Sequence, residues 1–132
     1  MAGTLQFDLV SPERKLASIL ATEVQIPGSE GDLTAMADHA PVITTLRPGV
    51  LRVISAEGTT AYVVTGGFAE VTASGASVLA EAAVPVAEMT AATLDKLIAD
   101  ASQTAGRATG SARDSAEKTL ADFQALRAAL GV

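Results

Sequence analysis

Cysteine and tryptophan are absent from the 132-residue sequence, and three Phe and one Tyr are its only aromatic residues. Without cysteine the chain can form no disulfide framework, no thiolate zinc site and no cysteine nucleophile. Because aromatic side chains are so few, it also has no platform on which bases or sugars could stack. We therefore expect a protein of the reducing cytoplasm whose function does not depend on cysteine.

Clusters of basic residues and long apolar runs are also missing. Nine Lys and Arg against fifteen Asp and Glu give a net charge of −6, and the basic residues are scattered singly, which argues against nucleic acid as a partner. No apolar stretch approaches the roughly 20 residues that span a bilayer. The N-terminus, Met1-Ala2-Gly3-Thr4, has no positive region, so we expect no signal or transit peptide. Any membrane association should go through protein partners.

The sequence does contain enough apolar residues to fold, 48% with a modest net charge. Its character changes near Pro85. Before this point, short alternating or β-branched runs are separated by Gly, Pro, Ser and Asp; after it, the chain is rich in Ala and has helical spacing. We therefore predict two domains, residues 1–85 and 86–132.

The first domain is predicted to be all-β, a sandwich or barrel of short strands. Turns at Ala56-Glu57-Gly58 and Ala73-Ser74-Gly75 predict hairpins between the strands on either side of them. The predicted strands are Leu5–Val10, Leu16–Ile26, Asp32–Met36, Val42–Leu46, Val50–Ala56, Thr60–Thr65, Phe68–Thr72 and Ser77–Ala82.

The second domain is predicted to be an antiparallel helical hairpin whose turn is bracketed by Gly106 and Gly110. Ser111, three residues before Asp114, is the expected N-cap of the second helix. Because much of the apolar surface is Ala, burial should stabilise this hairpin only marginally. The apolar faces are Leu94, Leu97, Ile98 and Ala101 on the first helix, and Ala116, Leu120, Phe123, Leu126 and Leu130 on the second.

No pattern predicts a catalytic residue, a metal site or a cofactor. Asp38 and His39 are neighbours that would point to opposite faces of an extended chain, so Asp38 is poorly placed to orient the imidazole as a triad acid does. The segment Pro27–Asp32 lacks the ligand spacing of a calcium loop and is interpreted as an exposed acidic turn, usable as a contact tip. Gly66-Gly67 is followed by no helix start and predicts a bulge or strand bend. These features favour an interaction or coupling subunit.

Several motifs, in this order and at this spacing, resemble the epsilon subunit of the rotary proton-translocating ATP synthase of bacteria or plastids. The resemblance covers essentially the whole chain, because a helical hairpin follows the motifs. The motifs are Val10-Ser11-Pro12, Pro27-Gly28-Ser29-Glu30-Gly31-Asp32-Leu33, His39-Ala40-Pro41 with Thr44, Leu46-Arg47-Pro48-Gly49, Tyr62, and Gly66-Gly67-Phe68-Ala69-Glu70-Val71.

The resemblance implies a non-catalytic rotor subunit: a β-sandwich plus two helices in the central stalk, coupling the c-ring to the gamma subunit and so proton flow to ATP synthesis. It also implies a place on the cytoplasmic face of the bacterial inner membrane, and a hairpin that can reach the alpha and beta catalytic subunits. The implied contact residues are Glu30, Gly31 and Asp32 for the c-ring, and Ser11, His39 and Thr44 for gamma.

The first helix departs from the family at its nucleotide motif. Many bacterial relatives carry Ile/Leu-Asp-x-x-Arg-Ala there and bind ATP. Here Asp95 matches the motif's Asp, but Ile98 stands in place of its Arg, which removes the phosphate-facing donors. We therefore predict no nucleotide site. Acidic residues offset the few basic ones on the second helix, so inhibition by the hairpin should be weak.

Two alternatives stay open at this point. One is a free-standing β-domain that binds a ligand, with the hairpin as a dimerisation element. The other is an enzyme that uses His39 as its general base. Copurification with gamma would separate the rotor subunit from both.

Overall fold

The computed structural model describes residues 3–131, and the chain divides into two units with the boundary between Val86 and Ala87. Met1 and Ala2, part of the segment predicted to carry no signal, lie outside the described residues. The first unit contains the strands β1 (Leu5–Val10), β2 (Lys15–Ala21), β3 (Glu23–Gly28), β4 (Gly31–Ala35), β5 (Val42–Thr45), β6 (Gly49–Ser55), β7 (Gly58–Val64), β8 (Gly67–Val71), β9 (Gly75–Ala80) and β10 (Ala83–Pro85).

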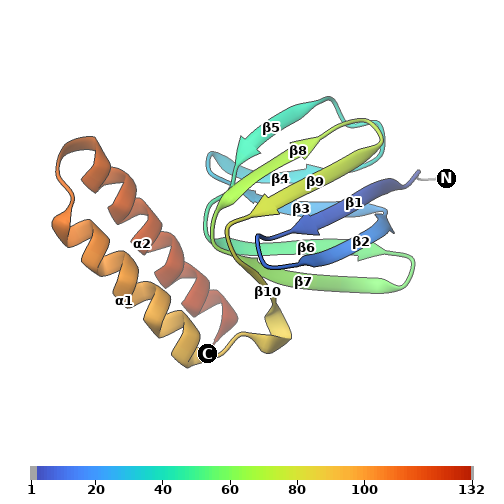
Figure 1. Ribbon diagram of the computed structural model, residues 1–132. Helices are drawn as coiled ribbons and strands as arrows, with labels where there is room; N and C mark the ends of the chain where they lie inside the picture. Colours follow the sequence, from blue (N-terminus) through green and yellow to red (C-terminus); the bar gives the residue numbers. More distant parts are fainter. Residues whose placement is uncertain (1–2, 132) are drawn as a thin grey trace. The chain divides into compact units, whose positions relative to one another are not determined.

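The strands of the described chain form two five-stranded sheets that stack as a sandwich (Figure 1). The first sheet has the order β2-β1-β9-β8-β5, and the second has the order β10-β7-β6-β3-β4. Neighbouring strands pair antiparallel, except that β1 lies parallel to β9. The predicted β-sandwich is confirmed, as are the β6–β7 and β8–β9 hairpins.

Alternation along the strands builds the core between the sheets. In β1, Leu5, Phe7 and Leu9 are at most 1% exposed, whereas Gln6 between them is exposed. Since successive side chains of a strand point to opposite faces, one face is buried and the other is left for solvent or partners. Burying each such large apolar side chain contributes roughly 1.5–3 kcal/mol.

The single strand predicted over Leu16–Ile26 is wrong, because the chain changes sheets at Thr22. The Thr22 N–H and its Oγ1 both donate to the carbonyl oxygen of Ile54, at 2.8 and 3.0 Å. These bonds hold a corner that places β2 in the first sheet and β3 in the second. Strand β10 was not predicted.

The second unit is a hairpin of α1 (Ala91–Arg107) and α2 (Gly110–Leu130), preceded by the short 3-10 helix η1 (Val86–Glu88). The Thr90 side chain caps α1 by accepting the Thr93 N–H at 3.2 Å. Leu94 and Ala105 of α1 are buried, as are Phe123 and Leu126 of α2. The predicted helical hairpin is confirmed.

Two details of the predicted hairpin turn are wrong. Gly106 lies inside the last turn of α1, and the N-cap of α2 is Thr109, whose side chain makes no capping bond, rather than Ser111. Ala108 and Thr109 have extended backbone and Gly110 has a φ of 62°, so the chain reverses within three residues. A turn this short leaves no room for a cap at Ser111.

Neither of the two helices described is long and apolar enough to cross a membrane.

Candidate partner-binding surfaces

The acidic tip is the turn of the β3–β4 hairpin. Gly28 pairs with Gly31, so Ser29 and Glu30 form the loop between the strands. Glu30, Gly31 and Asp32 are all exposed, and Gly31 has a φ of 141° that favours glycine. The structure therefore brings together the three residues predicted to face the c-ring.

The tip is fastened to the segment that links β5 and β6. Nη1 of Arg47 donates to the Gly28 carbonyl at 2.5 Å, and Nη2 forms an ion pair with the Asp32 carboxylate. The Arg47 main-chain N–H donates to the Pro27 carbonyl at 3.0 Å. The Arg47 side chain is 27% exposed and that of Asp32 is 79% exposed. Sequence reasoning noted Arg47 only as a motif residue and missed this contact.

The three residues predicted to face gamma do not form one cluster, because β9 and β8 lie between β1 and β5 in the first sheet. Ser11 follows β1, is 9% exposed, and donates through Oγ to the Arg14 carbonyl at 3.3 Å. Thr44 lies in β5, where its Oγ1 donates to the Thr45 carbonyl at 3.1 Å. His39 lies in the β4–β5 loop.

His39 is a half-buried residue of the β4–β5 loop. Its Nδ1 is 2.6 Å from the Ala40 carbonyl oxygen, so the imidazole is held by neighbouring backbone. Asp38 has a φ of 65°, and its N–H donates to the Ala73 carbonyl at 2.8 Å. This arrangement is a turn, not the base and orienting acid of a triad.

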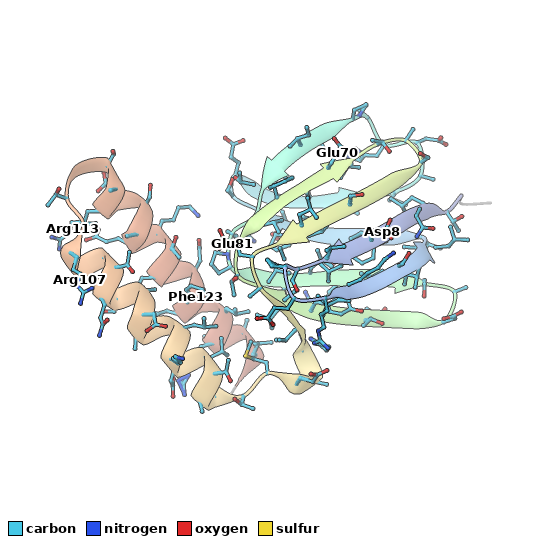
Figure 2. All side chains as sticks on the ribbon, viewed as in Figure 1. Asp8, Glu70, Glu81, Arg107, Arg113 and Phe123 are labelled. Carbon is cyan, nitrogen blue, oxygen red and sulfur yellow. The ribbon has the colours of Figure 1, made fainter. Side chains whose placement is uncertain are left out.

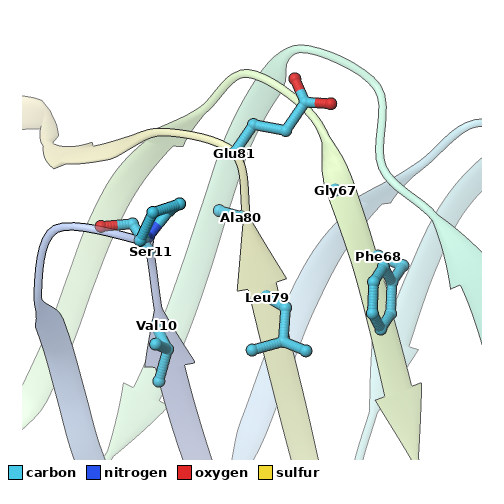
Figure 3. A pocket seen from close by; sticks show the side chains of 8 residues that line it. Val10, Ser11, Gly67, Phe68, Leu79, Ala80 and Glu81 are labelled. Carbon is cyan, nitrogen blue, oxygen red and sulfur yellow. The ribbon is translucent and has the colours of Figure 1, made fainter.

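An outer apolar row, Val10, Leu79 and Phe68, crosses the solvent-facing side of the first sheet. Val10 pairs with Leu79 and Leu79 with Phe68, on the adjacent strands β1, β9 and β8 (Figure 3). Phe68 is 47% and Leu79 45% exposed. Together with Ser11 and their neighbours, these side chains line an open hollow of about 420 Å³.

Sequence reasoning missed the outer apolar row, although the alternation of residues along the strands contains the signal. Ala69 and Val71 are buried in β8, and Val78 and Ala80 are buried in β9. The residues between them must therefore face outward. On the same face the next row is polar, with Asp8 on β1 and Glu70 on β8, both labelled in Figure 2.

The first helix carries the residues predicted for the nucleotide motif. Nη1 of Arg127 on α2 lies 2.6 Å from Oδ1 of Asp95 on α1, so this carboxylate is occupied by an ion pair between the helices. Ile98 is half-buried. The motif position that would supply a guanidinium to phosphate presents an aliphatic side chain instead.

The other basic residues of α2 are paired within the helix. Arg113 contacts Glu117 at 2.8 Å and Lys118 contacts Asp122 at 3.1 Å, both with i,i+4 spacing. In Figure 2, Arg113 near the start of α2 lies close to the turn of the hairpin. Across residues 3–131, no three His, Cys, Asp or Glu side chains gather in a way that could hold a metal ion.

Comparison with known proteins shows which class of protein the chain resembles. The family described as ATP synthase, Delta/Epsilon chain, beta-sandwich domain matches residues 4–86. The whole chain is similar to a chain in the cryo-EM structure of the Euglena gracilis mitochondrial ATP synthase with its c-ring, with a TM-score of 0.76, 26% identity, and coverage of 98% of this chain and 83% of that one.

Relatives of high sequence identity show which subunit of the ATP synthase the chain resembles. The chain is 66% identical to the ATP synthase epsilon chain of Fuscovulum blasticum over 99% of both chains, and 58% identical to that of Rhodobacter capsulatus over 96% of both. The chain belongs to the family of ATP synthase epsilon chains. It is thus a non-catalytic subunit of a membrane-associated ATP synthase complex. A free-standing ligand-binding β-domain and an enzyme that uses His39 as its general base are not favoured.

Proposed function

We propose that this subunit is a rotor element of the central stalk that joins the gamma subunit to the c-ring and so couples proton flow to ATP synthesis. The observation that carries the proposal is that one sandwich holds two different exposed surfaces, the fastened acidic tip and the outer apolar row. A linking subunit needs two such surfaces. In this proposal the β-sandwich domain, residues 1–85, links the two partners, and the helical hairpin, residues 86–132, has a separate role.

The acidic tip is the proposed c-ring contact. Glu30, Gly31 and Asp32 are exposed on a short turn, where charged side chains can meet a basic partner loop. Charge complementarity at such a contact contributes orientation and association rate more than affinity. The contacts of Arg47 with Gly28 and Asp32 suit this purpose, because they tie the turn to the sandwich.

The first sheet is the proposed gamma contact. Ser11 borders the hollow lined by the outer apolar row, and Thr45, next to Thr44, pairs with Phe68. His39 would contact gamma from the β4–β5 loop. Covering Phe68 and Leu79 would supply the apolar burial that dominates most protein associations.

The hairpin is proposed to have a weak regulatory role at most. Contacts with alpha and beta subunits would need free positive charge, whereas Arg113 and Lys118 are paired with acids of the same helix. With Asp95 engaged by Arg127 and Ile98 in the arginine position, we propose no nucleotide site. The complex would place this subunit on the cytoplasmic face of the bacterial inner membrane.

Copurification with gamma tests the proposal, with Leu79→Ser and Leu20→Ser as matched variants. Both leucines are exposed on the first sheet, at 45% and 62%, but only Leu79 belongs to the outer apolar row. Losing one buried leucine should weaken gamma binding about tenfold or more. We expect Leu79→Ser to lose gamma and Leu20→Ser to retain it. Equal recovery would contradict the assigned surface, and a wild-type chain found only as a free monomer or homodimer would contradict the function.

A further inference from the structure

We propose that Arg47 is the positioning residue of the acidic tip, and that it neutralises Asp32 so that Glu30 is the carboxylate presented to the partner. This inference rests on the proposed function of the tip as a contact with basic loops of the c-ring. It assigns different roles to the two acids of the turn, which sequence reasoning treated as equivalent.

The guanidinium of Arg47 joins the two sides of the turn. One nitrogen donates to the Gly28 carbonyl at the end of β3, and another pairs with the Asp32 carboxylate at the start of β4. A planar fork with fixed donor directions can hold two such acceptors at once, whereas a lysine ammonium is a point charge on a flexible stem. Arg47 therefore fixes the spacing of the strands at the tip.

Main-chain hydrogen bonds also connect the acidic tip to the segment between β5 and β6. Arg47 N–H donates to Pro27 at 3.0 Å, and Ser29 N–H donates to the Thr45 carbonyl at 2.8 Å. Gly28 forms an isolated bridge with Leu46. Because β5 and β6 belong to different sheets, the segment between them anchors the tip to both layers of the sandwich.

The two strands of the turn lie close together at Gly28. A Cβ on Gly28 would lie 2.6 Å from the Gly31 carbonyl oxygen, so the two strands already approach closely there. The Arg47 side chain is mostly buried while its partner Asp32 remains mostly exposed. The mostly buried Arg47 guanidinium thus neutralises the exposed Asp32 carboxylate.

Glu30 is the acid left over. It is exposed and takes part in none of the ion pairs found within residues 3–131. The turn therefore presents one uncompensated negative charge, at a position set by Arg47. A basic loop of a partner would meet Glu30, and Asp32 would act through the shape of the turn.

Hydrogen exchange on the isolated full-length chain tests the positioning role. Arg47→Gln should speed exchange of the Ser29 amide about tenfold, as expected from losing charge-assisted bonds, while amides of Phe7 and Val53 in the core stay unchanged. Arg47→Lys should give only partial rescue. The matched control is Arg52→Gln, an exposed arginine on β6 that should change neither set. Unchanged exchange at Ser29 in Arg47→Gln would overturn the positioning role.

Reconstitution of the complex tests the assignment of charge. Membranes depleted of this subunit are rebuilt with Glu30→Gln or Asp32→Asn, and release of the subunit is followed as salt increases. Glu30→Gln should lower the salt dependence of attachment more than Asp32→Asn does, because Asp32→Asn keeps the exposed Glu30 carboxylate and frees only the mostly buried Arg47 cation. An equal loss in both variants would overturn the separate roles of the acids. No effect in either would overturn the proposed c-ring contact and the role of Glu30 with it, while the role of Arg47 would still be decided by exchange.

Discussion

Gly67 is the residue on which the packing of the first sheet depends most directly. It begins β8 with a φ of 117°, and a Cβ there would lie 2.0 Å from the Leu79 carbonyl oxygen. A side chain at this position would both strain the backbone and push β8 away from β9. Gly67 therefore supports the outer apolar row, because Phe68 and Leu79 come from these two strands.

We expect Gly67→Ala to lower the free energy of unfolding by about 2–4 kcal/mol, since steric overlap adds to backbone strain. Urea denaturation of the full-length chain measures the change. Gly106→Ala is the matched control, because Gly106 is exposed in α1 with no atom within 4 Å of its added Cβ. That control should gain about 0.5–1 kcal/mol. A loss smaller than about 0.5 kcal/mol for Gly67→Ala would contradict the account.

At the scale of residues, the sequence predicted local features and missed contacts between distant positions. Two glycines in a row, Gly66-Gly67, predicted a strand bend because glycine is conformationally free. The composition of Pro27–Asp32 predicted the acidic turn. The pairing of Arg47 with Asp32 joins positions 15 residues apart, and no local rule specifies which acid an arginine meets. Phe68 and Leu79 could have been predicted to face outward by following the alternation of each strand.

At the scale of elements, the helical hairpin is held by the ion pair between Asp95 and Arg127 and by a narrow apolar seam. Asp95 and Arg127 are 57% and 35% exposed, so their contact is worth only about 0.2–1 kcal/mol. Leu94, Phe123 and Leu126 supply most of the large buried side chains. The hairpin should therefore be the less stable of the two units.

ATP at 1 mM should leave the melting temperature of this chain unchanged. A site with a dissociation constant of about 10 μM would add roughly 2.7 kcal/mol at this concentration, which a thermal melt detects. Ile98 supplies no donor to phosphate, and the Asp95 carboxylate is already engaged by Arg127. We expect an ATP-dependent rise only in Ile98→Arg; a clear rise in the unmodified chain would refute the prediction.

Element boundaries show where local sequence rules lose to tertiary contacts. Most strands were predicted from alternation, because one face of each is buried. The break between β2 and β3 depends on two bonds from Thr22 to Ile54, which lies 32 residues away. Likewise, Ser111 has the chemistry of an N-cap, but the position of Gly110 decides where α2 begins.

At the scale of the whole molecule, we expect the purified chain to hydrolyse no ATP. Gly66 and Gly67 lead into a strand rather than the helix start that cradles phosphate, and His39 is held by backbone in a turn. A phosphate-release assay on the isolated chain and on His39→Ala should give the same background for both. Turnover that disappears in His39→Ala would contradict this expectation.

The arrangement of the strands into two sheets could not be derived from the sequence pattern alone. Alternation identifies strands and their buried faces but not which strand lies beside which. The resemblance to epsilon subunits carried the prediction from a sandwich or barrel to a two-sheet sandwich. The separation of Ser11, His39 and Thr44 required coordinates, because it follows from the strand order, which puts β9 and β8 between β1 and β5.

The parallel pairing of β1 with β9 sets the order of events during synthesis of the chain. Gln6 has its partner at Gly75, so most of the first unit must leave the ribosome before the first strand can be enclosed. Until then the nascent chain exposes Phe7 and Leu9, which are fully buried in the finished sandwich. Such long-range pairing is slow and leaves an early edge open to wrong partners. The sandwich can therefore close only after β9 has been translated, and until then the first strands depend on chaperones or on their own hairpin for protection.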